Sequence, residues 1–139
     1  VSAMSDLAQE ARRARDRAHA PYSKFRVGSA VVTLDGRVFT GGNIENSSYG
    51  LTVCAERVAV FSAIAAGVKP RTFQEIYVCA AHEDSRGGEA LVPPCGACRQ
   101  VLWDLCGDIP VTMVSLDGRT ETVPLSDLLP RAFDDSLLL

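Results

Sequence analysis

Helix-like and strand-like segments alternate along this chain, and their order limits the possible folds more than any other feature of the sequence. Apolar residues recur at helical spacing near the start, and β-rich runs flank two Asp-Gly turns, at 35–36 and 117–118. Gly67 and Gly107 follow two further helical patterns and are expected to end them. The predicted helices span residues 5–19, 53–66, 96–106 and 127–129, and the predicted strands span residues 27–34, 37–42, 75–81, 109–116 and 119–125.

This order predicts an α/β fold with a mixed sheet. A helix between two strands carries the chain back across the sheet, so part of the sheet should be parallel. We therefore expect a three-layer α/β/α sandwich with a mixed sheet of about five strands. Pro21 is expected to end the first helix, and Ser126 is expected to cap the last. The 139 residues fit one domain, residues 1–139.

The charge balance and the hydropathy exclude several classes of partner. The chain carries 14 Lys and Arg against 17 Asp and Glu, a formal net charge of −3. This argues against a protein whose main task is to hold nucleic-acid phosphates. The arginine-rich stretch at 12–17 is interpreted as a solvated helix face. The first residues lack an apolar signal-peptide core, and the apolar stretch at 58–68 is too short to span a bilayer, so we expect a cytoplasmic protein with no membrane partner.

Three of the five cysteines lie in two short motifs that carry the candidate chemistry. One motif is Cys-Ala-Glu at 54–56, and the other is Pro-Cys-Gly-Ala-Cys at 94–98. Each motif opens a predicted helix, where unpaired N–H groups and the helix dipole stabilise thiolates. Three thiolates leave the fourth tetrahedral position of a zinc ion open to water, as in catalytic zinc sites. We therefore predict one Zn²⁺ per chain, held by Cys54, Cys95 and Cys98.

The residues beside these cysteines suggest how such a site would work. Glu56 follows Cys54 by two residues and is the candidate group for moving a proton from water to a substrate nitrogen. Three thiolates give the site a surplus of negative charge. Arg57 and Gln100 are candidate donors that turn toward the sulfurs and offset this charge.

Other interpretations of the cysteines remain open from the residues alone. A Cys-x-x-Cys pair also occurs in redox sites and in structural zinc sites with four protein ligands. Cys79 or Cys106 would then have to supply the fourth ligand. Cys79 lies in the middle of an apolar strand and Cys106 lies at the far end of its helix from Cys95, so both are interpreted as buried structural thiols.

The two motifs together match the Cys-x-Glu…Pro-Cys-x-x-Cys signature of zinc-dependent base deaminases in its three-cysteine form. Over nearly its whole length the chain resembles the small homotetrameric cytidine deaminases. Further matches are PYSKFRVG at 21–28, GNIENSSYG at 42–50 and LLPRAF at 128–133. Ser29 and Ser47 stand where alanine is common in that family, and the tail at 134–139 has no clear counterpart.

The resemblance implies a role for each matching position. It implies zinc binding by the three cysteines and proton transfer by Glu56. It also implies substrate contacts, with Phe25 near the base, Asn43 and Glu45 on the ribose hydroxyls, and the backbone around Ala55 at the base edge. In the family that this chain resembles, neighbouring subunits complete each active site. The resemblance therefore implies that Tyr49 and Phe133 reach into another protomer's pocket.

The function expected from this resemblance is hydrolytic deamination of cytidine and 2′-deoxycytidine to the uridines in pyrimidine salvage, with release of ammonia. Three alternatives remain: a deaminase for a nucleoside antibiotic, a nucleic-acid base editor, and a structural zinc module. The Asn-x-Glu-Asn sequence at 43–46 favours ordinary nucleosides. Cys54, in place of the histidine usual in editors, and the net charge of −3 argue against a polymer substrate. A structural module would need four protein ligands.

Overall fold

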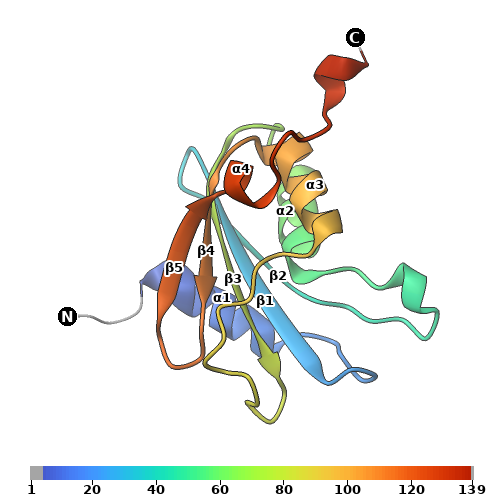
Figure 1. Ribbon diagram of the computed structural model, residues 1–139, viewed down its shortest axis with the longest axis vertical. Helices are drawn as coiled ribbons and strands as arrows, with labels where there is room; N and C mark the ends of the chain where they lie inside the picture. Colours follow the sequence, from blue (N-terminus) through green and yellow to red (C-terminus); the bar gives the residue numbers. More distant parts are fainter. Residues whose placement is uncertain (1–4, 139) are drawn as a thin grey trace.

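The computed structural model describes residues 5–138, so residues 1–4, which include Met4, and the last leucine of the tail lie outside the described part. The predicted single domain of residues 1–139 therefore extends beyond that part at both ends. Figure 1 shows a sheet with helices on both faces. In chain order the elements are α1 (Asp6–Asp16), β1 (Phe25–Thr33), β2 (Val38–Gly42), the 3-10 turn η1 (Tyr49–Leu51), α2 (Ala55–Ala65), β3 (Phe73–His82), α3 (Gly96–Cys106), β4 (Pro110–Val114), β5 (Thr120–Pro124), α4 (Leu125–Leu128) and η2 (Asp135–Leu137).

The five strands form one mixed sheet in the order β2-β1-β3-β4-β5. The pairs β1–β2, β1–β3 and β4–β5 are antiparallel. β3 and β4 are parallel, with Ile76 opposite Val111 and Cys79 opposite Val114, and α3 connects them. The predicted mixed sheet of five strands is confirmed. The sequence could predict the parallel pair because two parallel strands need a crossover connection, and a helical pattern lies between these two strands.

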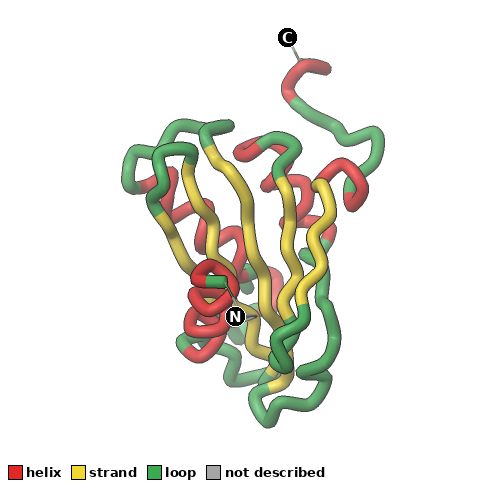
Figure 2. The backbone as a smooth tube through the Cα atoms, turned by 90° about the vertical axis from the view of Figure 1, so that its left-hand side faces the viewer, coloured by secondary structure: helices red, strands yellow, loops and turns green. Residues whose placement is uncertain are grey.

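Helices cover both faces of the sheet. Figure 2 shows α1 on one side of the sheet and the bulk of the other helices behind it. The core beneath α2 and α3 is mostly aliphatic and includes Val60, Ile76 and Leu102. The smaller core beneath α1 is lined by alanines of the helix, with Cys79 from β3. Cys79 and Cys106 are both buried, as expected for structural thiols. Among residues 5–138, no helix has the length and apolar character needed to cross a membrane.

Glycines in the hairpin allow the helices to pack closely on the sheet. A Cβ atom on Gly28 would lie 2.0 Å from the carbonyl oxygen of Ala11 in α1. A Cβ atom on Gly41 would lie 2.6 Å from the backbone nitrogen of Ala59 in α2. Both contacts are with backbone atoms, so a side chain at either position would push a helix away from the sheet. The hairpin therefore sets the spacing of the layers, including the position of α2.

The structure corrects three details of the expected elements. α1 ends at Asp16 rather than near Pro21, because His19 leaves the helix and exchanges backbone hydrogen bonds of 2.8 Å with the segment at 43–45. Arg15 is not on a solvated face: its side chain is buried and its guanidinium donates to the carbonyl oxygens of Ala81 and His82.

The cap of α4 also differs from the expectation. α4 begins at Leu125, one residue before Ser126, which is therefore not the cap. The backbone N–H of Ser126 instead donates to the Asp108 carboxylate over 2.8 Å. A side chain 18 residues away in the sequence thus satisfies the N–H group that a local cap would otherwise serve.

Candidate metal centre and adjoining pocket

The N-terminal ends of α2 and α3 bring three cysteines together. Cys54 is the N-cap residue of α2, Cys95 is the N-cap residue of α3, and Cys98 lies in the first turn of α3. The three sulfur atoms lie within 4.8 Å of one another. Within residues 5–138 no fourth His, Cys, Asp or Glu joins this cluster, which leaves Cys79 and Cys106 outside it. The structure therefore favours three protein ligands over the four of a structural zinc site.

The spacing of the sulfurs suits one zinc ion. Zn–S bonds of about 2.3 Å in tetrahedral geometry place two sulfurs about 3.8 Å apart. The Sγ atoms of Cys54 and Cys95 are 3.7 Å apart. Cys98 is fully buried while Cys95 is exposed, so the cluster is anchored in the core and open on one side. The donor set fits a zinc ion with one free coordination position.

Arg57 supplies positive charge to the sulfur cluster. Its Nη2 atom lies 3.5 Å from the Cys54 sulfur, so the side chain turns back toward the thiols. A hydrogen bond from the Cys98 thiol, and then the one from Arg57, lower the pKa of Cys54 to about 5, against the opposing effect of burial. Cys54 is thus disposed to act as a thiolate, and a bound cation would also displace the proton of Cys98.

Glu56 is buried beside the cluster and has an unpartnered oxygen. The residue is 4% exposed, and its Oε1 atom has no hydrogen-bond partner. Burial, together with the negative charge on Cys54, raises the pKa of this carboxyl group to about 7. A buried polar atom without a partner is costly, so a free oxygen here points to a ligand or water that pairs with it.

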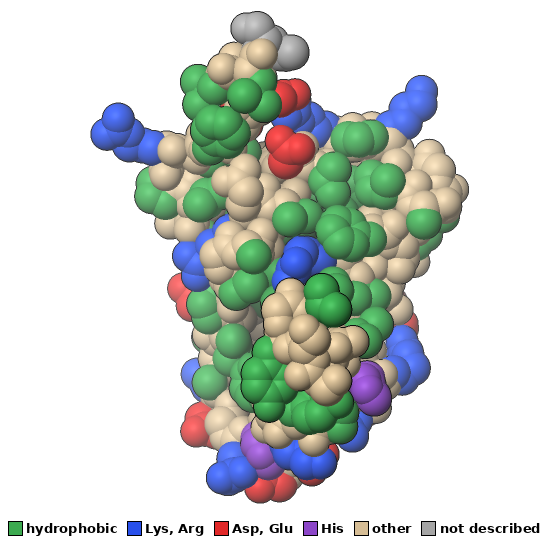
Figure 3. All heavy atoms as spheres, turned by 90° about the vertical axis from the view of Figure 1, so that its right-hand side faces the viewer, with side chains coloured by type: hydrophobic (Ala, Val, Ile, Leu, Met, Phe, Trp, Pro, Cys, Tyr) green, Lys and Arg blue, Asp and Glu red, His purple; other side chains and the backbone are tan. Residues whose placement is uncertain are grey.

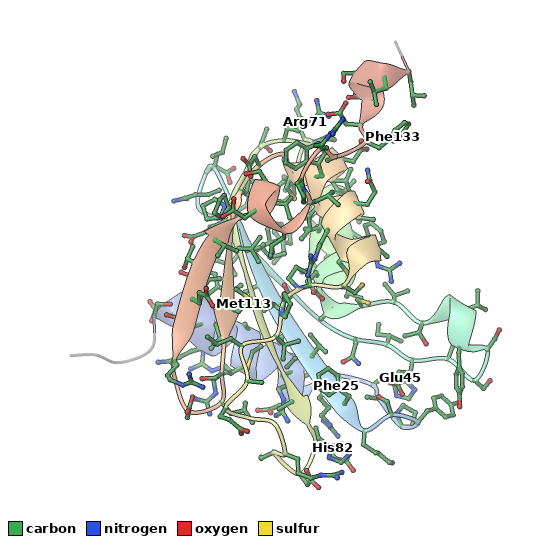
Figure 4. The ribbon with its side chains drawn as sticks, viewed as in Figure 1. Phe25, Glu45, Arg71, His82, Met113 and Phe133 are labelled. Carbon is green, nitrogen blue, oxygen red and sulfur yellow. The ribbon has the colours of Figure 1, made fainter. Side chains whose placement is uncertain are left out.

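A pocket of about 320 Å³ connects Glu56 and two of the cysteines with residues from the strands. β1 contributes Phe25, and the segment after β2 contributes Glu45. Figure 4 shows Phe25 and Glu45 near each other, toward the end of the sheet where β3 finishes at His82. The pocket is lined by Ser23, Phe25, Val27, Asn43, Glu45, Thr52, Cys54, Glu56, Val78, Val92, Pro93 and Cys95. It therefore joins residues of the predicted site that lie up to 70 positions apart in the sequence.

Asn43 is tied to the backbone of β1. Its Oδ1 atom accepts a hydrogen bond of 2.9 Å from the N–H of Val27, and its Nδ2 atom donates one of 2.9 Å to the carbonyl oxygen of Phe25. Since an amide carries two hydrogens on nitrogen, one remains for a ligand. Asn43 therefore holds the wall of the pocket in addition to any contact with a ligand.

The Glu45 carboxylate is held by the loop that precedes β1. Oε1 accepts hydrogen bonds from the N–H groups of Tyr22 (2.9 Å) and Ser23 (3.1 Å), and Oε2 accepts one from the Ser23 hydroxyl. Partial burial opposes ionisation, but the bonds from Ser23 and Tyr22 outweigh it, and the pKa of Glu45 lies below its usual value. The group is thus an ionised acceptor suited to donors such as hydroxyl groups.

Four other predicted positions lie outside this pocket. Ala55 is fully buried at the first position of α2, where its backbone N–H is among those that a helix leaves without an internal partner. Tyr49 is 73% exposed and lines an adjoining pocket with Tyr22 and Glu45. The Nε2 atom of Gln100 donates a hydrogen bond to the carbonyl oxygen of Phe133 over 2.8 Å. Gln100 was expected to turn toward the sulfurs, but this donor is directed to the backbone at Phe133 instead.

Phe133 lies far from the pocket of its own chain. Figure 4 shows it near Arg71, at the opposite end of the molecule from Phe25. The side chain is 55% exposed, and the tail that follows is fixed by Asp134, which accepts from Trp103, and by Asp135, which pairs with Arg71 over 3.1 Å. Within one chain Phe133 therefore belongs to an exposed, anchored segment and not to the pocket.

Several residues of the pocket were not among the predicted site residues. Ser23 carries the hydroxyl that binds Glu45, while Val92 and Pro93 form part of the wall before Cys95. Pro93 lies two residues before the candidate metal ligand Cys95, and this proximity was the signal available in the sequence. Ser23 gave no periodic signal, since its role depends on a residue 22 positions away.

Comparison with known proteins agrees with this geometry. The model of the cytidine and deoxycytidylate deaminase zinc-binding region matches residues 2–113. Cytidine deaminase of Sporosarcina psychrophila is 46% identical over 128 residues, which cover 91% of this chain and 88% of the relative. The enzyme of Halalkalibacterium halodurans is 45% identical, with 91% of each chain covered.

Solved structures give the same result. The crystal structure of cytidine deaminase from Burkholderia pseudomallei is 45% identical, has a TM-score of 0.85, and matches over 94% of this chain and 100% of that chain. The structure of the Bacillus anthracis enzyme shares the fold at 15% identity, with a TM-score of 0.65. With a family model that covers most of its length and relatives similar across nearly all of it, the chain belongs to the zinc-binding cytidine and deoxycytidylate deaminase family.

Proposed function

We propose that this protein is a cytidine deaminase, which hydrolyses cytidine and 2′-deoxycytidine to the uridines and ammonia. The observation that carries the proposal is a buried carboxyl group, Glu56, with a free oxygen beside three clustered thiols at a pocket that also contains Glu45. The relatives at about 45% identity, which are named as cytidine deaminases, support the same substrate.

In this reaction water adds to C4 of the base, and the bond from C4 to the amino nitrogen breaks. A bound zinc ion would supply the Lewis acid that lowers the pKa of the attacking water. Glu56 accepts one proton from that water and delivers it to N3, where it remains in the uridine. It then takes the second proton from the hydroxyl formed at C4 and delivers it to the amino group, which departs as ammonia while the C4 carbonyl forms. The burial of Glu56 excludes bulk water from this exchange, and a nearby dication favours the carboxylate form needed for the first transfer.

Arg57 and the helix ends balance the charge of the cluster. Three thiolates and one dication carry a net charge of −1, which weakens the activation of water. The guanidinium of Arg57 against Cys54 offsets part of this charge. The N-terminal ends of α2 and α3 add the positive ends of two helix dipoles.

The sugar and the base are assigned to the rest of the pocket. Glu45 is an ionised acceptor for sugar hydroxyl groups, and the remaining amide hydrogen of Asn43 is a second partner. Phe25, 39% exposed, offers a ring face to the base, and the backbone at Ala55 offers a donor to its edge. Such polar partners disfavour a free base, because its binding would leave them unpaired.

We further propose that the chain assembles as a homotetramer with shared active sites and acts in cytoplasmic pyrimidine salvage. Figure 3 views the side that carries η1 and shows many hydrophobic side chains on that surface. Ile44, Leu51 and Phe61 are all at least 45% exposed and line one apolar hollow beside η1, which ends at Leu51. This surface supports burial against other copies, with Tyr49 and Phe133 completing neighbouring pockets. Free thiols throughout residues 5–138 support a reducing compartment.

The decisive experiment combines turnover with a zinc count. Purified protein is expected to release ammonia from cytidine, with one zinc per chain and a mass in solution of four chains. Absence of both zinc and turnover would contradict the proposal. Faster turnover of an antibiotic nucleoside, or salt-dependent binding of single-stranded oligonucleotides, would replace it with one of the alternative deaminase functions.

A further inference from the structure

The strongest unassigned feature is the set of contacts that fixes Glu45. Among residues 5–138 its three hydrogen-bond donors come from two adjacent residues, Tyr22 and Ser23, in the loop between α1 and β1. Oε1 receives two backbone N–H groups, whereas Oε2 receives one donor, the Ser23 hydroxyl. Among the described residues, the Ser23 hydroxyl is therefore the side-chain donor to this carboxylate and the group that holds its second oxygen.

The Ser23 hydroxyl also has a fixed direction. The N–H of Phe25 donates to its oxygen over 3.0 Å. A hydroxyl has one hydrogen, and an ionised carboxylate can only accept, so this hydrogen is directed to Glu45. Ser23 thus links the backbone at Phe25, which lines the base side of the pocket, to the carboxylate on the sugar side.

The loop around Ser23 is itself held in place. Lys24 adopts a φ of 59°, and its N–H donates to the carbonyl oxygen of Ala20 over 3.0 Å. Its own carbonyl oxygen accepts from the N–H of Glu83 over 2.7 Å. These contacts join the loop to the end of β3, so Ser23 does not follow Glu45 freely but holds it against a fixed frame.

We propose that Ser23 is a positioning residue that holds the Glu45 carboxylate in the orientation that accepts hydrogen bonds from the substrate's sugar hydroxyls, and that it thereby contributes to selection of nucleosides with a hydroxylated sugar. This rests on the proposed function, since it assumes that a nucleoside occupies the pocket. Without the hydroxyl, Oε2 loses its only fixed donor among the described residues, and the carboxylate can rotate.

The test compares substrates that differ only in the sugar. For Ser23→Ala, kcat/KM for cytidine should fall about tenfold, mainly through KM, which is the size expected for one hydrogen bond to a charged group. For 2′,3′-dideoxycytidine, which lacks both ring hydroxyls, the variant should match the wild type. If turnover of that analogue is too slow to follow, its inhibition constant against cytidine gives the same comparison.

Matched variants separate positioning from a general structural effect. Ser23 is exposed, so Ser23→Thr has room for its methyl group and should restore the cytidine preference, whereas Ser23→Cys, a weaker donor, should be intermediate. Ser126→Ala, on α4 and outside the pocket, should leave the preference unchanged. Equal losses on both substrates, or no loss on cytidine, would overturn the positioning role. A wild type that does not deaminate cytidine would instead contradict the proposed function.

Discussion

Replacement of Glu56 by glutamine tests the proposed chemistry most directly. The change keeps the volume of a side chain that is 4% exposed, and removes the group that accepts and delivers a proton. One general acid–base group contributes about 10²–10⁴ in rate. Because Glu56 is assigned successive transfers, at the water, at N3 and at the amino group, we expect kcat to fall at least about 10⁴-fold, or about 5.5 kcal/mol in activation free energy.

The fold and the metal site should survive this substitution. Oε1 of Glu56 has no partner to lose, so the free energy of unfolding should change by less than about 2 kcal/mol. The assay follows the loss of ultraviolet absorbance of cytidine, with zinc counted per chain and unfolding measured in urea. Glu45→Gln is the matched comparison, a carboxylate-to-amide change in the same pocket that should raise KM and leave kcat within about tenfold.

One result would contradict the assigned role of Glu56, and another would contradict the expected survival of the metal site. If Glu56→Gln retains zinc and deaminates cytidine within tenfold of the wild-type rate, Glu56 does not carry the proton. If the variant loses zinc, the carboxyl group acts in metal retention, and the loss of activity says nothing about proton transfer.

Three further predictions follow from the structure. Cys98→Ser should lower zinc from one per chain to below about one tenth, because an uncharged hydroxyl replaces the fully buried sulfur, and elemental analysis measures this; retention of a full zinc ion would remove Cys98 from the ligand set. Gly28→Ala should lower the free energy of unfolding by about 3 kcal/mol or more, because its Cβ would meet the α1 backbone, while Gly50→Ala, with open space around it, should change it by less than about 0.5 kcal/mol in urea titrations; equal effects would contradict the close approach of α1. Native protein should resist alkylation at Cys79 and Cys106 at pH 8, since burial raises both pKa values, that of Cys106 to about 12, and rapid labelling detected by mass spectrometry would show that these thiols are accessible.

Local signals in the sequence predicted the elements that carry the metal ligands. The predicted helix at 96–106 coincides with α3, because an apolar helical pattern is followed by Gly107 with a φ of 79°. The strands predicted on either side of the Asp-Gly turns begin and end within two residues of the observed strands. The end of α1 was placed too late, since the pairing of His19 with the segment at 43–45 is a contact that helical periodicity does not report.

The order of residues along the chain specifies which chemical groups this protein has for its reaction, and the packing of the fold specifies how those groups are arranged. The spacing of residues in the sequence is enough to predict candidate thiolate ligands at the starts of two helices. It also predicts a carboxyl group two residues after Cys54. That Arg15 is buried, that Gln100 binds the backbone at Phe133, and that Ser23 holds Glu45 depend on segments 22 to 67 residues apart. Hydrogen bonds between residues so far apart in the sequence form only when packing brings the two segments together. A local pattern of residue types therefore cannot predict them.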